Sequence, residues 1–249
     1  MLIKTDSFTL ATYAKGDSNS KKLALVLPGK LDSKDYAHMI SHVDYLASLG
    51  YFALSFDPPG TWESPGDISL YTMTNYLKAI NELIKYYGNK PTFVMGHSRG
   101  ASMTILSGLT NPFITSFASI FSSFTEGGYK DNSDITRWKE KGYLLEKRDL
   151  PPGGGPKIRE FKLPYGFFED QLRYDVAKDL EHSNKPKLFM LGKRDVLAVP
   201  EVIKQLYSIT SDPKELYELD SDHNYRFHPE LIEEVNKVVG DFLYKYNQI

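Results

Sequence analysis

The stretch FVMGHSRGASM, residues 93–103, places Ser98 between Gly96 and Gly100, after an apolar run and before small residues. The apolar run is typical of a buried strand, and the residues after the serine favour a helix. At a sharp strand–turn–helix connection the two flanking positions require glycine, and the serine hydroxyl is raised above the sheet edge near backbone N–H groups. The alternative is a helix-capping serine in a tight turn. We predict that Ser98 is a nucleophile on an α/β scaffold.

The rest of the chain alternates in the same way between apolar strands and amphipathic helices. Most expected strands are continuously apolar, which is typical of strands covered on both faces. We expect strands at 22–29, 51–60, 92–96, 116–122, 187–192 and 215–219, and antiparallel edge strands near 2–4 and 8–15. We expect helices from Ser33 or Asp35 to Gly50, and over 69–87, 101–109 and 229–246. This alternation predicts a mostly parallel, doubly wound sheet flanked by helices.

One segment, 124–185, departs from this alternation and is polar and aromatic. Its Gly/Pro cluster at 150–157 separates two stretches that can pair as a hairpin, and 165–180 has the pattern of an amphipathic helix. The segment is too long for an ordinary connection, and long loops on a rigid scaffold are often lids. We therefore predict a single domain over 1–249 with a lid insertion at 124–185.

Composition excludes several classes of protein. A chain of 249 residues with a formal net charge of −2 and mixed signs lacks the basic field of a nucleic-acid binder. No apolar run is long enough to cross a bilayer, and no secretory signal is visible at the N-terminus. The absence of cysteine removes disulfides and thiolate chemistry. We expect a cytoplasmic protein whose partner is a small molecule; the sequence does not predict its oligomeric state.

A serine nucleophile needs a base, and His223 is the best placed of the six histidines. It follows the last expected strand, at the edge where α/β sheets gather active groups. The other histidines are His38, His42, His97, His182 and His228. The first two share a helix face, but no glutamate or third ligand accompanies them, so we predict no metal. His97 is expected to pack beneath the turn that carries Ser98.

The histidine in turn needs an acid, and Asp195 lies just beyond the end of another expected strand. The order Ser, Asp, His along the chain is the one that this class of fold uses. Asp220 and Asp222 are too close to His223 in sequence to reach it correctly, and the Asp-Pro-Pro-Gly context of Asp57 indicates a turn. The developing oxyanion needs two N–H donors. We predict the backbone N–H groups of Arg99 and Lys30.

With these residues in place, the chain resembles the α/β-hydrolase superfamily over essentially its whole length. The resemblance depends on GHSRGA, GKRDVLAVP and SDHNY in that order. Within the superfamily the chain is similar to small lidded serine esterases, which include feruloyl and cinnamoyl esterases. The segment FDPPGTWESPG is similar to the family's Asp-x-x-Gly-x-Gly-x-Ser element, although Trp62 replaces a glycine. Pro28-Gly29 also stands where the family often has His-Gly.

The resemblance implies a serine hydrolase that cleaves acyl esters through an acyl-enzyme, without metal or organic cofactor. The insertion is rich in aromatic rings, which stack on planar acyl groups. These residues are Tyr129, Trp138, Tyr143, Phe161, Tyr165, Phe167 and Phe168. We predict an aromatic or medium-length acyl ester, with Lys30 and Trp62 favouring a carboxylate on the substrate. The predicted pocket residues are Trp62, Trp138, Tyr143, Tyr165 and Phe168.

Two alternatives stay open. The same three residues also serve thioesterases, peptidases, acyltransferases and carbon–carbon bond hydrolases, because pocket shape chooses the leaving group. A catalytically silent small-molecule receptor on this fold is the alternative outside enzymes.

Overall fold

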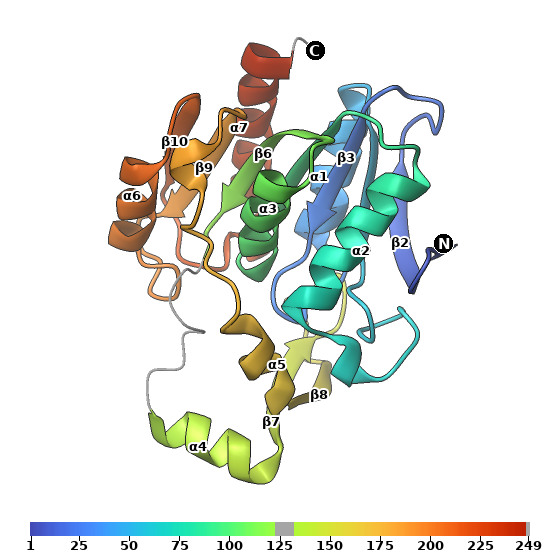
Figure 1. Cartoon of the computed structure of the whole chain (residues 1–249), viewed down its shortest axis with the longest axis vertical. Coiled ribbons are helices and arrows are strands. Elements are labelled where there is room, and N and C mark those ends of the chain that lie inside the picture. The colour runs from blue at the N-terminus through green and yellow to red at the C-terminus, as the bar shows by residue number, and fades with distance from the viewer. Residues whose placement is uncertain (123–131, 248–249) are drawn as a thin grey trace.

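The computed structural model describes residues 1–122 and 132–247. Within these residues the main sheet has eight strands in the order β1-β2-β4-β3-β5-β6-β9-β10 (Figure 1). Their bounds are β1 Leu2–Lys4, β2 Thr9–Lys15, β3 Leu23–Leu27, β4 Phe52–Phe56, β5 Thr92–His97, β6 Ile114–Ile120, β9 Lys187–Gly192 and β10 Lys214–Leu219. β1 and β2 are antiparallel to their neighbours, and the other pairs are parallel. The predicted fold class is confirmed.

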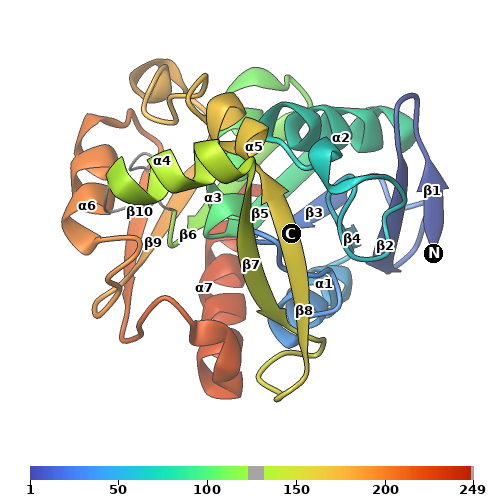
Figure 2. The same cartoon turned by 90° about the horizontal axis from the view of Figure 1, so that it is seen from below.

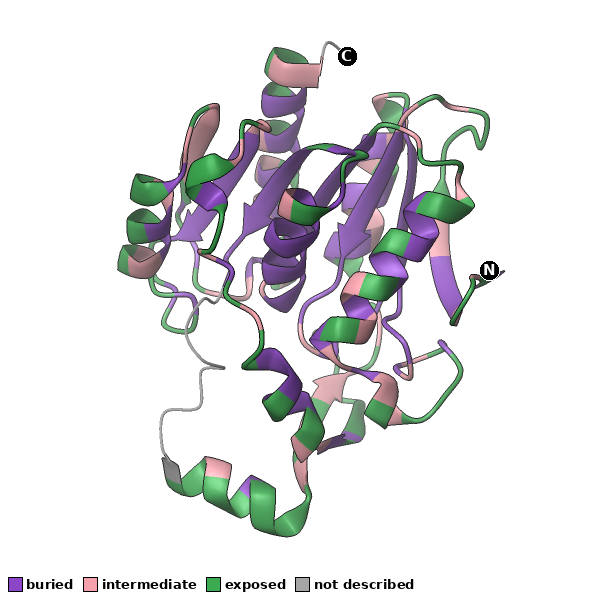
Figure 3. Ribbon diagram, viewed as in Figure 1, coloured by how far each residue is buried: buried purple, intermediate pink, exposed green. Residues whose placement is uncertain are grey.

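Helices cover both faces of this sheet. Figures 1 and 2 show α1 and α7 on one face and α2 and α3 on the other, with α6 beside β9. Their bounds are α1 Ala37–Ser48, α2 Met73–Tyr86, α3 Arg99–Thr110, α6 Pro200–Ile209 and α7 Pro229–Asn247. Every residue of β3, β4, β5 and β9 is buried, as the purple central strands of Figure 3 show. Coverage on both sides is the physical reason for their continuous apolar sequences.

The described part of the insertion lies over the carboxyl ends of the parallel strands, and Figure 2 shows this arrangement from below. Its described part contains α4 Asn132–Lys141, the hairpin β7 Tyr143–Asp149 and β8 Ile158–Pro164, α5 Tyr165–Gln171 and a 3-10 turn at Leu180–His182. The hairpin pairs the two stretches expected to pair, from Tyr143 opposite Pro164 to Asp149 opposite Ile158.

The tip of this hairpin contacts the start of α1. The residue before the helix, Tyr36, makes no side-chain capping bond to it. Instead the Ala37 N–H donates to the carbonyl oxygen of Pro152 at 3.0 Å. The Tyr36 hydroxyl donates to the carbonyl oxygen of Asp149 at 2.7 Å. The first N–H groups of a helix have no partner inside it. In α1 the first of them, that of Ala37, is satisfied by Pro152 of the insertion.

The helix predicted from Ser33 or Asp35 to Gly50 is shorter, over Ala37–Ser48, and two other predicted helices also differ from those observed. The expected helix over 165–180 ends at Gln171, where the Arg173 and Tyr174 N–H groups donate to the carbonyl groups three residues before them and close a tighter last turn. Further on, the Asp175 carboxylate accepts the Ala177 N–H in a local turn that competes with helix. The expected helix over 69–87 begins at Met73, where the Thr72 hydroxyl caps the N–H of Asn75. Within the described residues, no helix combines the length and apolar character that crossing a membrane requires.

Candidate active site

Ser98 lies in the connection from β5 to α3 with φ 54° and ψ −116°, a conformation that non-glycine residues seldom adopt. The glycines around it are required by close backbone contacts. A Cβ on Gly96 would lie 2.4 Å from the carbonyl oxygen of Gly100. A Cβ on Gly100 would lie 2.0 Å from the carbonyl oxygen of Leu27. The strain at Ser98, on the order of 1–3 kcal/mol, is therefore held in place by tight packing on both sides.

The structure brings Ser98, His223 and Asp195 together from three different loops. The distance from Ser98 Oγ to His223 Nε2 is 2.9 Å, and that from His223 Nδ1 to Asp195 Oδ2 is 2.7 Å. The Asp195 side chain is fully buried, and its Oδ1 accepts the N–H groups of Leu197 and Ala198, both at 2.8 Å. Because a carboxylate accepts hydrogen bonds, this contact favours the His223 tautomer with its proton on Nδ1 and leaves Nε2 facing the serine hydroxyl.

His97 and His42 lie in the core behind these residues. His97 Nε2 is 3.0 Å from the carbonyl oxygen of His223 and so contacts the loop that carries that histidine. His42 lies between Asn236 Oδ1, at 2.6 Å from Nδ1, and the Tyr225 hydroxyl, at 2.8 Å from Nε2. Burial lowers the pKa of His42 to about 4, against a partial rise from the Asn236 hydrogen bond, so the ring stays neutral. It acts as a core residue.

Asp32, His38 and His97 form a buried cluster whose ligand atoms lie within 4.8 Å of one another. Burial holds the pKa values of both histidines well below the usual range, as metal ligation would need. However, Asp32 Oδ2 and His97 Nδ1 are 4.0 Å apart, whereas ligands around tetrahedral zinc lie about 3.3–3.5 Å apart. The guanidinium of Arg148 also lies 3.7 Å from Asp32. Spacing and charge both disfavour a divalent cation, and we assign none.

The loop after β3 lies beside Ser98 because β3 and β5 are neighbours, with Leu27 opposite Gly96. In this loop the Asp32 N–H donates to the Gly29 carbonyl oxygen at 3.2 Å and closes a turn around Lys30. Arg99 begins α3, directly after Ser98. Both residues predicted as oxyanion donors therefore flank the serine.

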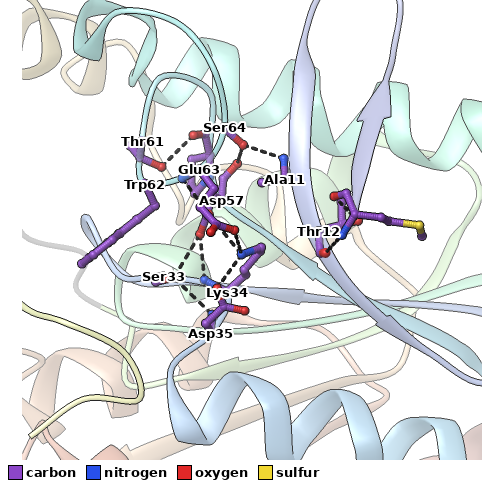
Figure 4. Close-up of polar contacts among 12 residues, drawn as sticks. Ala11, Thr12, Ser33, Lys34, Asp35, Asp57, Thr61, Trp62, Glu63 and Ser64 are labelled. Atoms are coloured by element: carbon purple, nitrogen blue, oxygen red, sulfur yellow. Dashed lines mark hydrogen bonds and ion pairs between the residues drawn. The ribbon is translucent and has the colours of Figure 1, made fainter.

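Asp57, at the end of β4, holds the loop after β3 against the loop after β4. Its buried carboxylate accepts the Lys34 N–H at 2.9 Å and the Glu63 N–H at 3.1 Å (Figure 4). The Ser33 hydroxyl lies 3.3 Å from the same carboxylate, and the Lys34 ammonium 3.5 Å. Burial raises the pKa of Asp57, and the Lys34 contacts oppose part of that rise. Its Asp-Pro-Pro-Gly sequence indicated a turn but not this role between two loops.

The predicted pocket residues have different surroundings. Trp62 donates its indole N–H to the Leu31 carbonyl oxygen at 2.9 Å, next to the predicted oxyanion loop. Its φ of 44° lies in the left-handed region, which favours glycine. Trp138 is only 2% exposed and packs against Tyr165, Phe167 and Phe168. Tyr143 lies between the ammonium groups of Lys141 and Lys162, at 4.6 and 5.3 Å from its ring centre. Tyr129 lies outside the described residues.

Sequence reasoning missed a set of charged contacts between the hairpin and the loops around Ser98. Arg226, three residues after His223, forms a two-pronged pair with Asp149 at 3.0 and 3.2 Å. Burial alone would raise the pKa of Asp149, but Arg226 and the Gly154 N–H lower it to about 2. No local pattern signals this pair, because its partners are far apart in sequence.

The sheet order, the flanking helices and the serine at the β5–α3 connection define the class: the chain has the α/β-hydrolase fold. No family model matches the sequence. The chain is similar to Est1E of Butyrivibrio proteoclasticus, solved with ferulic acid bound, with a TM-score of 0.75, 19% identity and complete coverage of both chains. It is also similar to the α/β hydrolase GrgF of Penicillium sp. sh18, with a TM-score of 0.81 and 15% identity over 100% of this chain and 98% of that one.

Among curated proteins, the chain is 24% identical to the lysophosphatidylserine lipase ABHD12 of Danio rerio over 224 residues. The match covers 87% of this chain and 53% of the lipase, so the chain spans about half the length of that relative.

Proposed function

We propose that this protein is a serine hydrolase that cleaves carboxylic acyl esters, with Ser98 as nucleophile, His223 as base and Asp195 as its orienting acid. The observation that carries the proposal is the continuous contact from Ser98 Oγ through the His223 ring to Asp195, at 2.9 and 2.7 Å. A serine hydroxyl is a weak nucleophile alone, and this contact gives it a base of fixed tautomer. The α/β hydrolase GrgF and the lysophosphatidylserine lipase ABHD12, to which the chain is similar, support the reaction class.

In the proposed reaction the Ser98 oxygen bonds to the substrate carbonyl carbon while His223 Nε2 takes the hydroxyl proton. The tetrahedral oxyanion accepts the N–H groups of Lys30 and Arg99, each worth about 3–4 kcal/mol when well placed. Collapse breaks the bond to the alcohol, which leaves with the proton from His223. Water then attacks the acyl-enzyme, gives a proton to His223 and releases the acid, and the proton returns to Ser98. These steps need no metal or organic cofactor.

We propose an aromatic or medium-length acyl group as the substrate class. The support is the density of aromatic rings in the insertion. We propose that this insertion, residues 124–185, is a lid within a single domain over 1–249. The side chains assigned to the pocket are Trp62, Trp138, Tyr143, Tyr165 and Phe168. A cytoplasmic location is part of the proposal; it is based on the absence of cysteine, and cell fractionation tests it.

A fluorophosphonate probe and a series of p-nitrophenyl esters test the chemistry. We expect covalent labelling and turnover in the wild type and neither in Ser98→Ala. Ser107→Ala is the matched control, because Ser107 is a buried serine of α3, the helix that follows Ser98, and its hydroxyl donates to the Thr104 carbonyl oxygen. A folded wild-type protein that is neither labelled nor active would refute the proposal and favour a receptor. Matched thioesters and amides then identify the leaving group, and acyl chains of graded size test the substrate class.

A further inference from the structure

The hairpin strand β7 contacts the turn that is proposed to supply an oxyanion donor. Arg148 donates to the Lys30 carbonyl oxygen from both Nε, at 2.9 Å, and Nη2, at 2.5 Å. The same guanidinium lies 3.7 Å from the Asp32 carboxylate, at the other end of that turn. A planar guanidinium that binds one acceptor through two N–H groups fixes both its position and its direction.

The peptide group between Lys30 and Leu31 is thereby held at both of its polar atoms. Its carbonyl oxygen accepts from Arg148, and its N–H donates to the Tyr71 hydroxyl at 3.1 Å. Leu31 adopts φ 57°, a left-handed conformation that a residue with a side chain keeps only when its surroundings impose it. The proposed donor is the N–H of Lys30, one peptide bond upstream, so its direction depends on how this peptide is held.

A second contact from the same face of β7 reinforces the first. The Glu146 carboxylate lies 2.6 Å from the Lys30 ammonium. Burial lowers the pKa of Lys30, and Glu146 opposes this change by favouring the charged form. Residues 146 and 148 point to one face of the strand because side chains alternate. Lys147, between them, is exposed and pairs with Glu160 at 3.3 Å on the hairpin surface.

We propose that Arg148 is a positioning residue for the oxyanion donor. By holding the Lys30 carbonyl group, this side chain of the insertion fixes the direction of the Lys30 N–H in the loop after β3. This inference rests on the proposed function. Arg148 acts through the Lys30 peptide and does not touch the reacting atoms. Loss of one oxyanion donor typically costs 10²–10³ in kcat. A donor that is misdirected but present should cost about 10- to 100-fold in kcat, with KM changed by less than about twofold.

The experiment compares Arg148→Ala and Arg148→Lys with Lys147→Ala, which removes a charge from the opposite face of the same strand. For Arg148→Ala we expect kcat to fall about 10- to 100-fold. The affinity for a reversible boronic acid, which mimics the tetrahedral intermediate, should fall by the same factor as kcat. Affinity for the carboxylic acid product should stay within about twofold. Arg148→Lys should recover part of kcat, and Lys147→Ala should match the wild type.

Two results would overturn the inference: wild-type kcat in Arg148→Ala, or losses of product and boronic acid affinity that are equal. If Arg148→Ala does not fold, Arg148→Lys and the double variant Arg148→Met with Asp32→Asn give the same comparison, because the second removes the buried carboxylate that would be left unpaired. Failure of the proposed function has a different signature, namely a wild-type protein without turnover or probe labelling.

Discussion

Gly100→Ala tests whether the connection at Ser98 is fixed by backbone packing. The added Cβ would lie 2.0 Å from the carbonyl oxygen of Leu27 and 2.7 Å from that of Pro28. An ordinary contact needs about 3.4 Å, so α3 and the end of β3 must separate by about 1.4 Å. Both obstacles are backbone atoms at the end of a central strand, so they cannot move aside as a flexible side chain can.

Overpacking of this kind typically costs 1–3 kcal/mol, and alanine returns up to about 1 kcal/mol of helix propensity. Because the clash involves backbone, we expect a net loss of about 2–3 kcal/mol in the free energy of unfolding. A displacement near 1 Å in the nucleophile should also lower kcat about 100-fold or more. Urea unfolding followed by tryptophan fluorescence gives the first quantity, and initial rates of p-nitrophenyl butyrate hydrolysis give the second.

Gly166→Ala is the matched control, since Gly166 is also in the first turn of a helix, but nothing lies within 4 Å of its added Cβ. We expect this variant to gain up to about 1 kcal/mol and to keep its activity. Wild-type stability and rate in Gly100→Ala would show that the close approach of α3 and β3 does not hold the serine in place.

Three further predictions concern the strain and the charges of the site. Ser98→Gly should exceed Ser98→Ala in stability by about 1 kcal/mol in urea unfolding, because only glycine relieves the strain at φ 54°; equal stabilities would contradict this. Asp195→Asn should lower kcat about 10⁴-fold with little change in KM, because the amide favours the wrong tautomer of His223; stopped-flow and steady-state rates check it. Folding lowers the pKa of Asp149 from 3.8 to about 2. The pair of Asp149 with Arg226 therefore stabilises the fold fully above about pH 4. About 2 kcal/mol of the free energy of unfolding is lost as the pH falls towards 2. We expect the free energies of unfolding of the wild type and Asp149→Asn, measured against pH, to converge between about pH 4 and pH 2. Curves that stay parallel over this range would show that the pair contributes nothing.

The sheet could be predicted because its central strands are covered on both faces, which leaves runs such as Leu23–Leu27 continuously apolar. The connection at Ser98 could be predicted because glycine is needed where two backbones nearly touch. Strand ends were less predictable, since inter-strand hydrogen bonds set them; Ile114–Ile120 begins two residues before the apolar pattern indicated.

Contacts between distant charged residues were beyond sequence reasoning. Arg148 and Asp149 lie in a polar hairpin whose composition is that of an exposed surface, yet they contact Lys30 and Arg226. A single sequence pairs neither, because any of its many charges could serve as partner. The ring of Trp138 illustrates the same limit for apolar residues, since its burial among other aromatic rings depends on how the insertion folds.

The carbonyl group of Pro152 at the hairpin tip has a consequence for engineering. It supplies the acceptor that the N-terminus of α1 lacks from its own preceding residue. Replacing the hairpin with a shorter loop, or exchanging it for the insertion of another protein of this fold, would leave the Ala37 N–H without this acceptor. A Ser, Thr, Asp or Asn at position 36, where Tyr36 would no longer have Asp149 as a partner, would cap the second or third N–H of the helix and so offset part of that loss.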